Sequence, residues 1–337
     1  MLKHSPITLD AFRANNASVH LLVEDCFGMR TPHATLILGP SGTGKGYLAS
    51  LLAMGLLCSA DANKPCGDCK SCKRCQAGTH SNLLDLTAGK NEKSIKIDQV
   101  RALQDRLPLH ALETGRRVVL IREADTMTIQ AQNALLKSLE EPDRNTSFML
   151  TASNEGAVLP TILSRCRLVR MSPWPAGHVE SILLTQGVPE ALAADIAASS
   201  GGKPIYALQM YRDQRYQKLN SIIDNAFFSE NLPIKIPWAS ATLRDHAADG
   251  DVLLDIFESR LARLMTEKVQ NQPPTATAQP DDRWAAAKAD AVRRIIQAVF
   301  EARKYRGSNV SWQSATDLLL LTISKEIFYA DGHRRSV

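Results

Sequence analysis

The chain has 337 residues, of which 44% are hydrophobic and 22% are charged, and this composition excludes a wholly disordered or fibrous protein. At about 100 to 200 residues per domain, the length predicts two to three domains, while the formal net charge of +5 permits an anionic partner without requiring one. The longest apolar stretch of the N-terminal half, residues 47–60, is too short for a membrane span, and the first twenty residues lack the apolar core of a signal peptide, so we expect a cytoplasmic protein with no membrane partner.

Short apolar runs alternate with helical stretches from His33 onward. Five of these runs predict β-strands, several with apolar residues on both faces: residues 34–38, 82–86, 118–121, 147–151 and 167–170. Buried strands separated by helices are typical of a parallel sheet with helices on both sides. We therefore expect an α/β domain over residues 1–172, which ends where segment 171–175 places two prolines within three residues.

The remainder of the sequence has a helical pattern. Apolar residues at spacings of three and four, such as Val179, Ile182 and Leu183, predict a small helical domain over residues 173–212. The same periodicity returns after residue 213 and predicts an all-helical domain over 213–337. Between its helices, the polar and proline-rich segment 270–280 predicts a flexible loop.

A phosphate-binding loop pattern, Gly-x-x-x-x-Gly-Lys, follows the first predicted strand and is formed by Gly39, Gly42, Gly44 and Lys45. Such a loop directs backbone N–H groups at phosphate oxygens, and the helix that follows favours negative charge. The next residue should be Ser or Thr, whose hydroxyl binds Mg²⁺, but it is Gly46. A simple glycine turn is the plainer interpretation, and the strand–loop–helix context favours a fold descended from a nucleotide-binding loop.

A second part of ATP chemistry is altered at the end of the predicted strand 118–121. A hydrolysing enzyme of this type has an acidic residue there to organise the Mg²⁺ shell, and a neighbouring carboxylate to position water. Arg122 takes the first position, where a guanidinium repels the ion, whereas Glu123 remains as a vestigial catalytic carboxylate and Asp125 substitutes at most in part. The Mg²⁺ site thus lacks both the hydroxyl after Lys45 and the acidic residue at the strand end. We therefore predict that the chain binds ATP weakly or not at all and does not hydrolyse it.

Five of the seven cysteines lie close together, as Cys58, Cys66, Cys69, Cys72 and Cys75. Disulfides are rare in a reducing compartment, whereas four thiolates around Zn²⁺ make a closed structural site. By spacing alone Cys75 can replace Cys58 in such a site. Unliganded thiols and an iron–sulfur cluster are the alternative interpretations.

The order of the motifs resembles that of the bacterial clamp-loader subunits of the AAA+ class. The resemblance rests on the phosphate loop, the cysteine cluster, residues 133–142 (Asn-Ala-Leu-Leu-Lys-Ser-Leu-Glu-Glu-Pro) and residues 161–166 (Thr-Ile-Leu-Ser-Arg-Cys). Within this class the sequence resembles the delta-prime subunits of DNA polymerase III more than the gamma/tau subunits, which keep the Thr, the Asp and a sensor Arg. Ile205 aligns with that sensor position, and the resemblance covers about residues 30–210.

The resemblance implies an AAA+ type parallel sheet covered by helices, a small helical lid and an all-helical collar for oligomerisation. It implies a stator-like subunit that helps to load a sliding clamp onto primed DNA at the bacterial replisome, with gamma/tau and delta subunits as partners. It also selects Cys58, Cys66, Cys69 and Cys72 as ligands of a structural Zn²⁺. Arg165 is implied to act in trans, as an arginine finger directed at the ATP of a neighbouring subunit.

Two other functions stay open at this stage. An ATP-hydrolysing motor subunit of the gamma/tau type requires that Lys45 and Glu123 suffice for catalysis. A small-molecule phosphotransferase with the same loop is disfavoured by the helical C-terminal region and by the lack of a substrate-binding motif in the sequence. ATP hydrolysis by the isolated chain distinguishes both from a non-hydrolysing subunit.

Overall fold

The computed structural model describes residues 7–28, 31–61, 63–89, 92–109, 116–142, 145–270, 282–306 and 310–329. The flexible loop expected at 270–280 lies, after its first residue, outside these ranges. The chain forms two compact units, the first comprising Met1–His178 with Gly202–Ile205 and the second Val179–Gly201 with Tyr206–Val337. The further division of the helical part into lid and collar stays a prediction.

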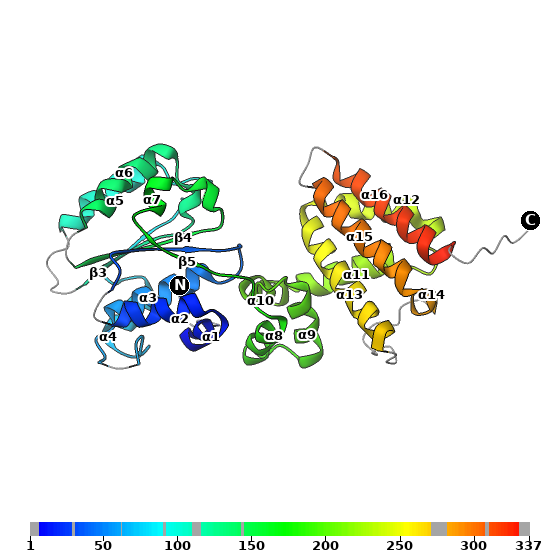
Figure 1. The fold of residues 1–337 in the computed structure, drawn as a ribbon, viewed down its shortest axis with the longest axis horizontal. Coiled ribbons are helices and arrows are strands. Elements are labelled where there is room, and N and C mark those ends of the chain that lie inside the picture. Colours follow the sequence, from blue (N-terminus) through cyan, green and yellow to red (C-terminus); the bar gives the residue numbers. More distant parts are fainter. Residues whose placement is uncertain are drawn as a thin grey trace, which may run out of the picture. The chain divides into compact units, whose positions relative to one another are not determined.

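The first unit contains a five-stranded parallel sheet (Figure 1). Its strands, in the spatial order β2-β3-β4-β1-β5, are β1 Ala34–Leu38, β2 Leu83–Leu86, β3 Arg117–Ile121, β4 Thr146–Ala152 and β5 Arg167–Arg170. All five predicted strands are confirmed, with ends that differ by one residue at most. Every residue of β1, β3 and β4 is buried, which explains why apolar side chains occupy both faces of these strands.

Helices cover both faces of this sheet: α2 and α3 lie on one side, and α5 and α6 on the other (Figure 1). The helices of the first unit are α1 Leu9–Asn15, α2 Ala17–Phe27, α3 Lys45–Leu57, α4 Lys70–Ala77, α5 Ile97–Leu109, α6 Ile129–Glu140 and α7 Pro160–Leu163. Alternate strand residues such as Leu36, Val119 and Phe148 form one apolar core with Val100 of α5 and Leu135 of α6. The predicted α/β sheet of AAA+ type is confirmed by this arrangement.

Local sequence explains where the helices near the phosphate loop begin. Gly44 adopts a left-handed conformation with φ of 97°, which turns the chain from the loop into α3. The side chain of Thr128 accepts a hydrogen bond from the N–H of Ala131 at 3.2 Å and so caps α6. Pro142 follows the end of this helix, as is common after a helix C-terminus.

The described elements that follow β5 are all helical, as the sequence predicts. They are α8 Ala176–Thr185, α9 Glu190–Ser199, α10 Pro204–Arg212, α11 Arg215–Phe227, α12 Leu232–Asp245, α13 Gly250–Gln270, α14 Asp282–Ala286, α15 Ala289–Arg306 and α16 Trp312–Ile323, which continues into a π-helical turn at Ser324–Phe328. Stacked aromatic rings at the centre of the second unit include Phe227 and Phe257, whose centroids lie 4.3 Å apart. None of the helices in the described ranges is both long enough and apolar enough to cross a membrane.

Candidate functional site: a modified phosphate loop and a cysteine cluster

The glycines of the predicted phosphate loop adopt backbone conformations that side chains disfavour. Gly39, Gly42 and Gly44 all have positive φ, of 153°, 84° and 97°. A Cβ atom at Gly39 would lie 2.4 Å from the carbonyl oxygen of Met171, and one at Gly44 would lie 3.0 Å from the ring of Phe12. The loop therefore needs glycine for two reasons, its dihedral angles and the close packing around it.

Lys45 is 8% exposed, and its amine forms hydrogen bonds with other atoms of the chain. Its Nζ donates to the carbonyl oxygen of Pro40 at 2.9 Å and to Ser153 Oγ at 3.1 Å. Burial lowers the pKa of Lys45, and the charges of Asp125 and Glu123 oppose this effect. The predicted phosphate-binding cation thus lies at the loop, in contact with loop and strand-end atoms.

Two carbonyl oxygens of the loop accept hydrogen bonds from residues far away in the sequence. Trp174 Nε1 donates to the carbonyl of Thr43 at 3.0 Å, and the N–H of Ile205 donates to the carbonyl of Gly42 at 3.1 Å. The family resemblance aligned Ile205 with the sensor-arginine position, and in the structure the backbone of Ile205 contacts the loop. The role of Trp174 was not foreseen, although a tryptophan between two prolines is an unusual feature.

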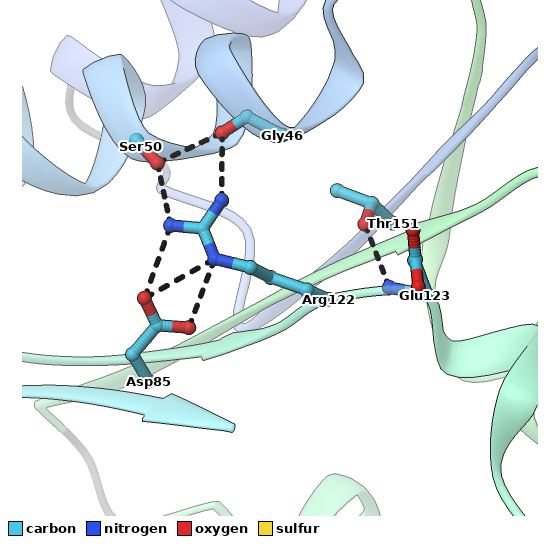
Figure 2. A network of polar contacts seen from close by, with 6 residues as sticks. All are labelled: Gly46, Ser50, Asp85, Arg122, Glu123 and Thr151. Atoms are coloured by element: carbon cyan, nitrogen blue, oxygen red, sulfur yellow. Dashed lines mark hydrogen bonds and ion pairs between the residues drawn. The ribbon is translucent and has the colours of Figure 1, made fainter. Parts of the chain in front are cut away.

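The guanidinium of Arg122 lies beside the first turn of α3 and joins three elements (Figure 2). Its Nε donates to both carboxylate oxygens of Asp85, at 3.0 and 3.2 Å. Its Nη2 donates to Asp85 Oδ2 and Ser50 Oγ, and its Nη1 to the carbonyl oxygen of Gly46 at 3.3 Å. Asp85 and Ser50 were not among the predicted site residues; a single carboxylate inside the apolar strand β2 was the available signal.

The two remaining carboxylates near the loop differ in their contacts. Glu123 has a left-handed backbone with φ of 53°, and its N–H donates to Thr151 Oγ1 at 3.1 Å. Asp125 Oδ2 accepts the N–H groups of Ser153 and Asn154, at 3.0 and 2.9 Å. Asp125 is therefore engaged by backbone amides, and the cation of Arg122 lies where a hydrolysing enzyme would organise Mg²⁺.

The four cysteines selected by the resemblance come together, and their sulfur atoms all lie within 4.8 Å of one another. Cys58 Sγ lies 3.6 Å from Cys66 Sγ and 3.9 Å from Cys69 Sγ. A tetrahedral zinc site with Zn–S bonds of about 2.3 Å has S–S edges of about 3.8 Å. The donor set and its spacing therefore fit Zn²⁺, with Cys72 as the fourth ligand.

Backbone amides support the thiolate forms of Cys66 and Cys69, whereas burial raises the pKa of Cys72. The N–H of Cys69 donates to Cys66 Sγ at 3.4 Å, and the N–H of Cys72 donates to Cys69 Sγ at 3.3 Å. The amide of Cys69 lowers the pKa of Cys66, and hydrogen bonding by Ser59 lowers the pKa of Cys69 to about 5. Cys75 lies outside the group of four, and burial raises its pKa to about 11.

Arg165 follows the short helix α7, and its side chain is 34% exposed. Its Nη2 lies 2.5 Å from Glu140 Oε1, at the end of α6, and its Nη1 donates to the carbonyl oxygen of Thr161 at 2.9 Å. In the described part of the chain, none of its polar contacts involves the phosphate loop. Arg165 and Lys45 are thus not brought together within one chain.

Comparisons with known proteins find similarity to subunits of DNA polymerase III. The family model described as DNA polymerase III, delta subunit, matches residues 14–175. DNA polymerase III subunit delta' of Pseudomonas aeruginosa is 38% identical over 56% of this chain and 60% of its own length, and that of Escherichia coli is 31% identical over 64% and 70%. The tau subunit of Escherichia coli is 37% identical over 41% of this chain and 21% of its own length.

Proposed function

Since the chain belongs to the delta-prime family of DNA polymerase III subunits, we propose that it is a stator-like subunit of a clamp loader. In this role it helps to load a sliding clamp onto primed DNA, beside gamma/tau and delta subunits. The similarity to tau subunits supports a clamp-loader context. We assign residues 1–172 to the nucleotide-binding-like domain, 173–212 to the lid and 213–337 to the oligomerising collar.

The contact between Arg122 and Asp85 carries the proposal that the chain does not hydrolyse ATP. Catalytic loops of this type use a hydroxyl after the Lys and an acidic strand end to hold Mg²⁺. Here Gly46 offers a carbonyl to the guanidinium, and Asp85 neutralises that cation. The guanidinium occupies the place of the acidic residue and position 46 has no hydroxyl, so Mg²⁺ lacks two of its usual ligands and we expect any nucleotide to be bound weakly and without Mg²⁺.

The alternative function, an ATP-hydrolysing motor subunit, makes the opposite prediction. Lys45 and Glu123 are both present, so the test is steady-state phosphate release by the purified chain compared with the matched Lys45→Ala variant. We expect no difference between them. Phosphate release clearly above the variant would favour the motor subunit.

We assign a structural Zn²⁺ to Cys58, Cys66, Cys69 and Cys72. The metal would join the end of α3 to the start of α4, and with four protein ligands it would have no open position for water. Its contribution is therefore stability of the segment after α3. No catalytic step is assigned to it.

We assign Arg165 the role of an arginine finger in trans. A cation directed at a γ-phosphate stabilises the negative charge that spreads over the phosphoryl group during transfer. The Arg165 side chain is partly exposed and makes no polar contact with the chain's own phosphate loop among the described residues, which supports a target on a neighbouring subunit. In the isolated chain Glu140 neutralises this guanidinium.

Reconstitution tests the whole proposal. We expect the chain to copurify with gamma/tau and delta subunits and to be required for clamp loading, while the phosphate loop variant Lys45→Ala loads the clamp as well as the natural chain. A loader that works equally well without the chain would refute the stator role. Loss of loading in Lys45→Ala would favour the motor alternative.

A further inference from the structure

A cavity of about 300 Å³ lies on the α5/α6 face of the sheet, away from the phosphate loop contacts. Its strand side is formed by Arg117, Thr146 and Phe148, and its helix side by Leu107 of α5 with Ser138 and the α6 C-cap residue Glu141. This volume is at the lower end of the range typical of small-molecule sites.

Arg117 is the charged group of this cavity most able to bind an anion, because it is buried and has no carboxylate partner among the described residues. The residue is 7% exposed, and its Nη1 donates to the carbonyl oxygen of Leu107. Its Nε is buried and has no hydrogen-bond partner. Across the described ranges, no Asp or Glu forms an ion pair with it. A buried charge without a counter-charge is unfavourable, and an anion bound beside Arg117 would offset that cost.

The sheet fixes a second unpaired group beside this arginine. Arg117 and Thr146 are register partners on the neighbouring parallel strands β3 and β4. Their side chains therefore point to the same face, and Thr146 Oγ1 is buried without a hydrogen-bond partner. Two polar groups with unused hydrogen bonds thus lie next to each other at one end of the cavity.

The other walls limit what such an anion can be. Phe148 lies two residues beyond Thr146 on the same face, is 1% exposed, and offers an apolar ring surface. Glu141 is exposed at the α6 end of the cavity, and its negative charge disfavours ligands with more than one negative charge. A ligand with one carboxylate and an apolar body therefore suits the Phe148 ring and the Glu141 charge better than a phosphate dianion does.

We propose that this cavity binds a small-molecule monocarboxylate, whose oxygens accept hydrogen bonds from Arg117 and Thr146 while its apolar part contacts Phe148. The guanidinium fork matches a carboxylate in geometry as well as in charge.

Benzoate and its neutral isostere benzamide are suitable probes, together with inorganic phosphate. Each is titrated into the full-length chain, with affinity measured by calorimetry and the binding position by amide NMR shifts. We expect benzoate to bind at least about tenfold more tightly than benzamide, because hydrogen bonds to ionised groups are about twice as strong as neutral ones. Inorganic phosphate should bind more weakly than benzoate.

Three variants test whether the preference for benzoate arises in this cavity. Arg117→Gln should abolish the preference for benzoate, whereas the adjacent Arg116→Gln, outside the cavity lining, should leave it unchanged. Should Arg117→Gln fail to fold, Glu141→Gln still tests the proposal, because removal of the negative charge should tighten benzoate binding and leave benzamide unaffected. Equal affinities for benzoate and benzamide, or shifts that do not include Thr146, would overturn the proposal, as would a Glu141→Gln variant that binds benzoate no better.

Discussion

Gly46 and Arg122 are packed against each other, so the effect of a substitution at one depends on the other. A Cβ atom at position 46 would lie 3.2 Å from Arg122 Nη1. The guanidinium cannot easily retreat, because Asp85 and Ser50 hold it from two other sides (Figure 2). A side chain at position 46 and the arginine at position 122 therefore compete for the same space.

This competition predicts non-additive stability. Alanine is favoured over glycine in helices by about 1 kcal/mol, but in the natural chain the Arg122 contact offsets that gain. We expect Gly46→Ala to stabilise the Arg122→Ala variant by about 1 kcal/mol and the natural chain by clearly less. Urea unfolding of the four proteins measures the coupling, and additive effects would show that the two residues do not compete.

Lys45 predicts a pH dependence. Because burial lowers its pKa below the ordinary value of 10.5, the folded chain binds this proton less tightly than the unfolded chain. The charged amine therefore reduces stability at neutral pH, and this cost falls as the pH rises from the lowered pKa toward 10.5. Between pH 7 and pH 10, the stability difference between the natural chain and Lys45→Met should move in favour of the natural chain. A difference that does not change with pH would contradict this.

Among the elements, the strands could be predicted from sequence, whereas their order could not. A buried strand is a local apolar run, so residues 34–38 and 167–170 were located without error. The placement of β3 between β2 and β4 depends on crossovers through helices, which no local pattern encodes. For this reason Arg122 was recognised as unusual, while its partner Asp85, 37 residues away, was not.

The cysteine cluster was predictable because its spacing is nearly local. Three of its four members lie within one short segment, Cys66 to Cys72, and only Cys58 comes from the end of α3. The contact between Arg165 and Glu140, in contrast, could not be predicted from the sequence. Each residue belongs to a recognisable motif, but only the packing of α6 beside α7 brings them together.

The element α4 should depend on the metal. It has eight residues, fewer than the roughly 12 to 15 that an isolated helix needs. We expect elemental analysis to find about one zinc per chain. The Cys72→Ser variant should lose both the zinc and the helical signal of α4. The matched variant Cys75→Ser should retain the zinc. A zinc-free chain in which α4 keeps its amide protection from hydrogen exchange would contradict this.

At the scale of the whole molecule, the described residues include a modified phosphate loop and a partly exposed arginine, Arg165, which have no polar contact partner in common. Lys45 and Trp174 donate hydrogen bonds to the phosphate loop, whereas the polar contacts of Arg165 with described residues are with α6 and its own turn. This arrangement supports the proposal that the chain contributes to ATP chemistry through a neighbouring subunit.

The corresponding prediction concerns the assembled loader. Arg165→Ala should leave assembly and zinc content intact and should partly lower DNA-stimulated ATP hydrolysis by the neighbouring subunit. A sole arginine finger contributes roughly 10³ to 10⁵ in rate, and the loss here should be smaller because several ATP sites work in one loader. Failure to assemble, or an unchanged rate of hydrolysis, would make Arg165 a structural contact instead.

The contact between Gly46 and Arg122 also has an evolutionary consequence. To gain a metal-binding hydroxyl at position 46 first, a lineage must crowd a guanidinium that Asp85 holds in place. To lose Arg122 first, it must leave Asp85 and Ser50 without their partner. Each order of substitution passes through a less favourable intermediate, so a hydroxyl at position 46 and the loss of Arg122 would rarely arise together.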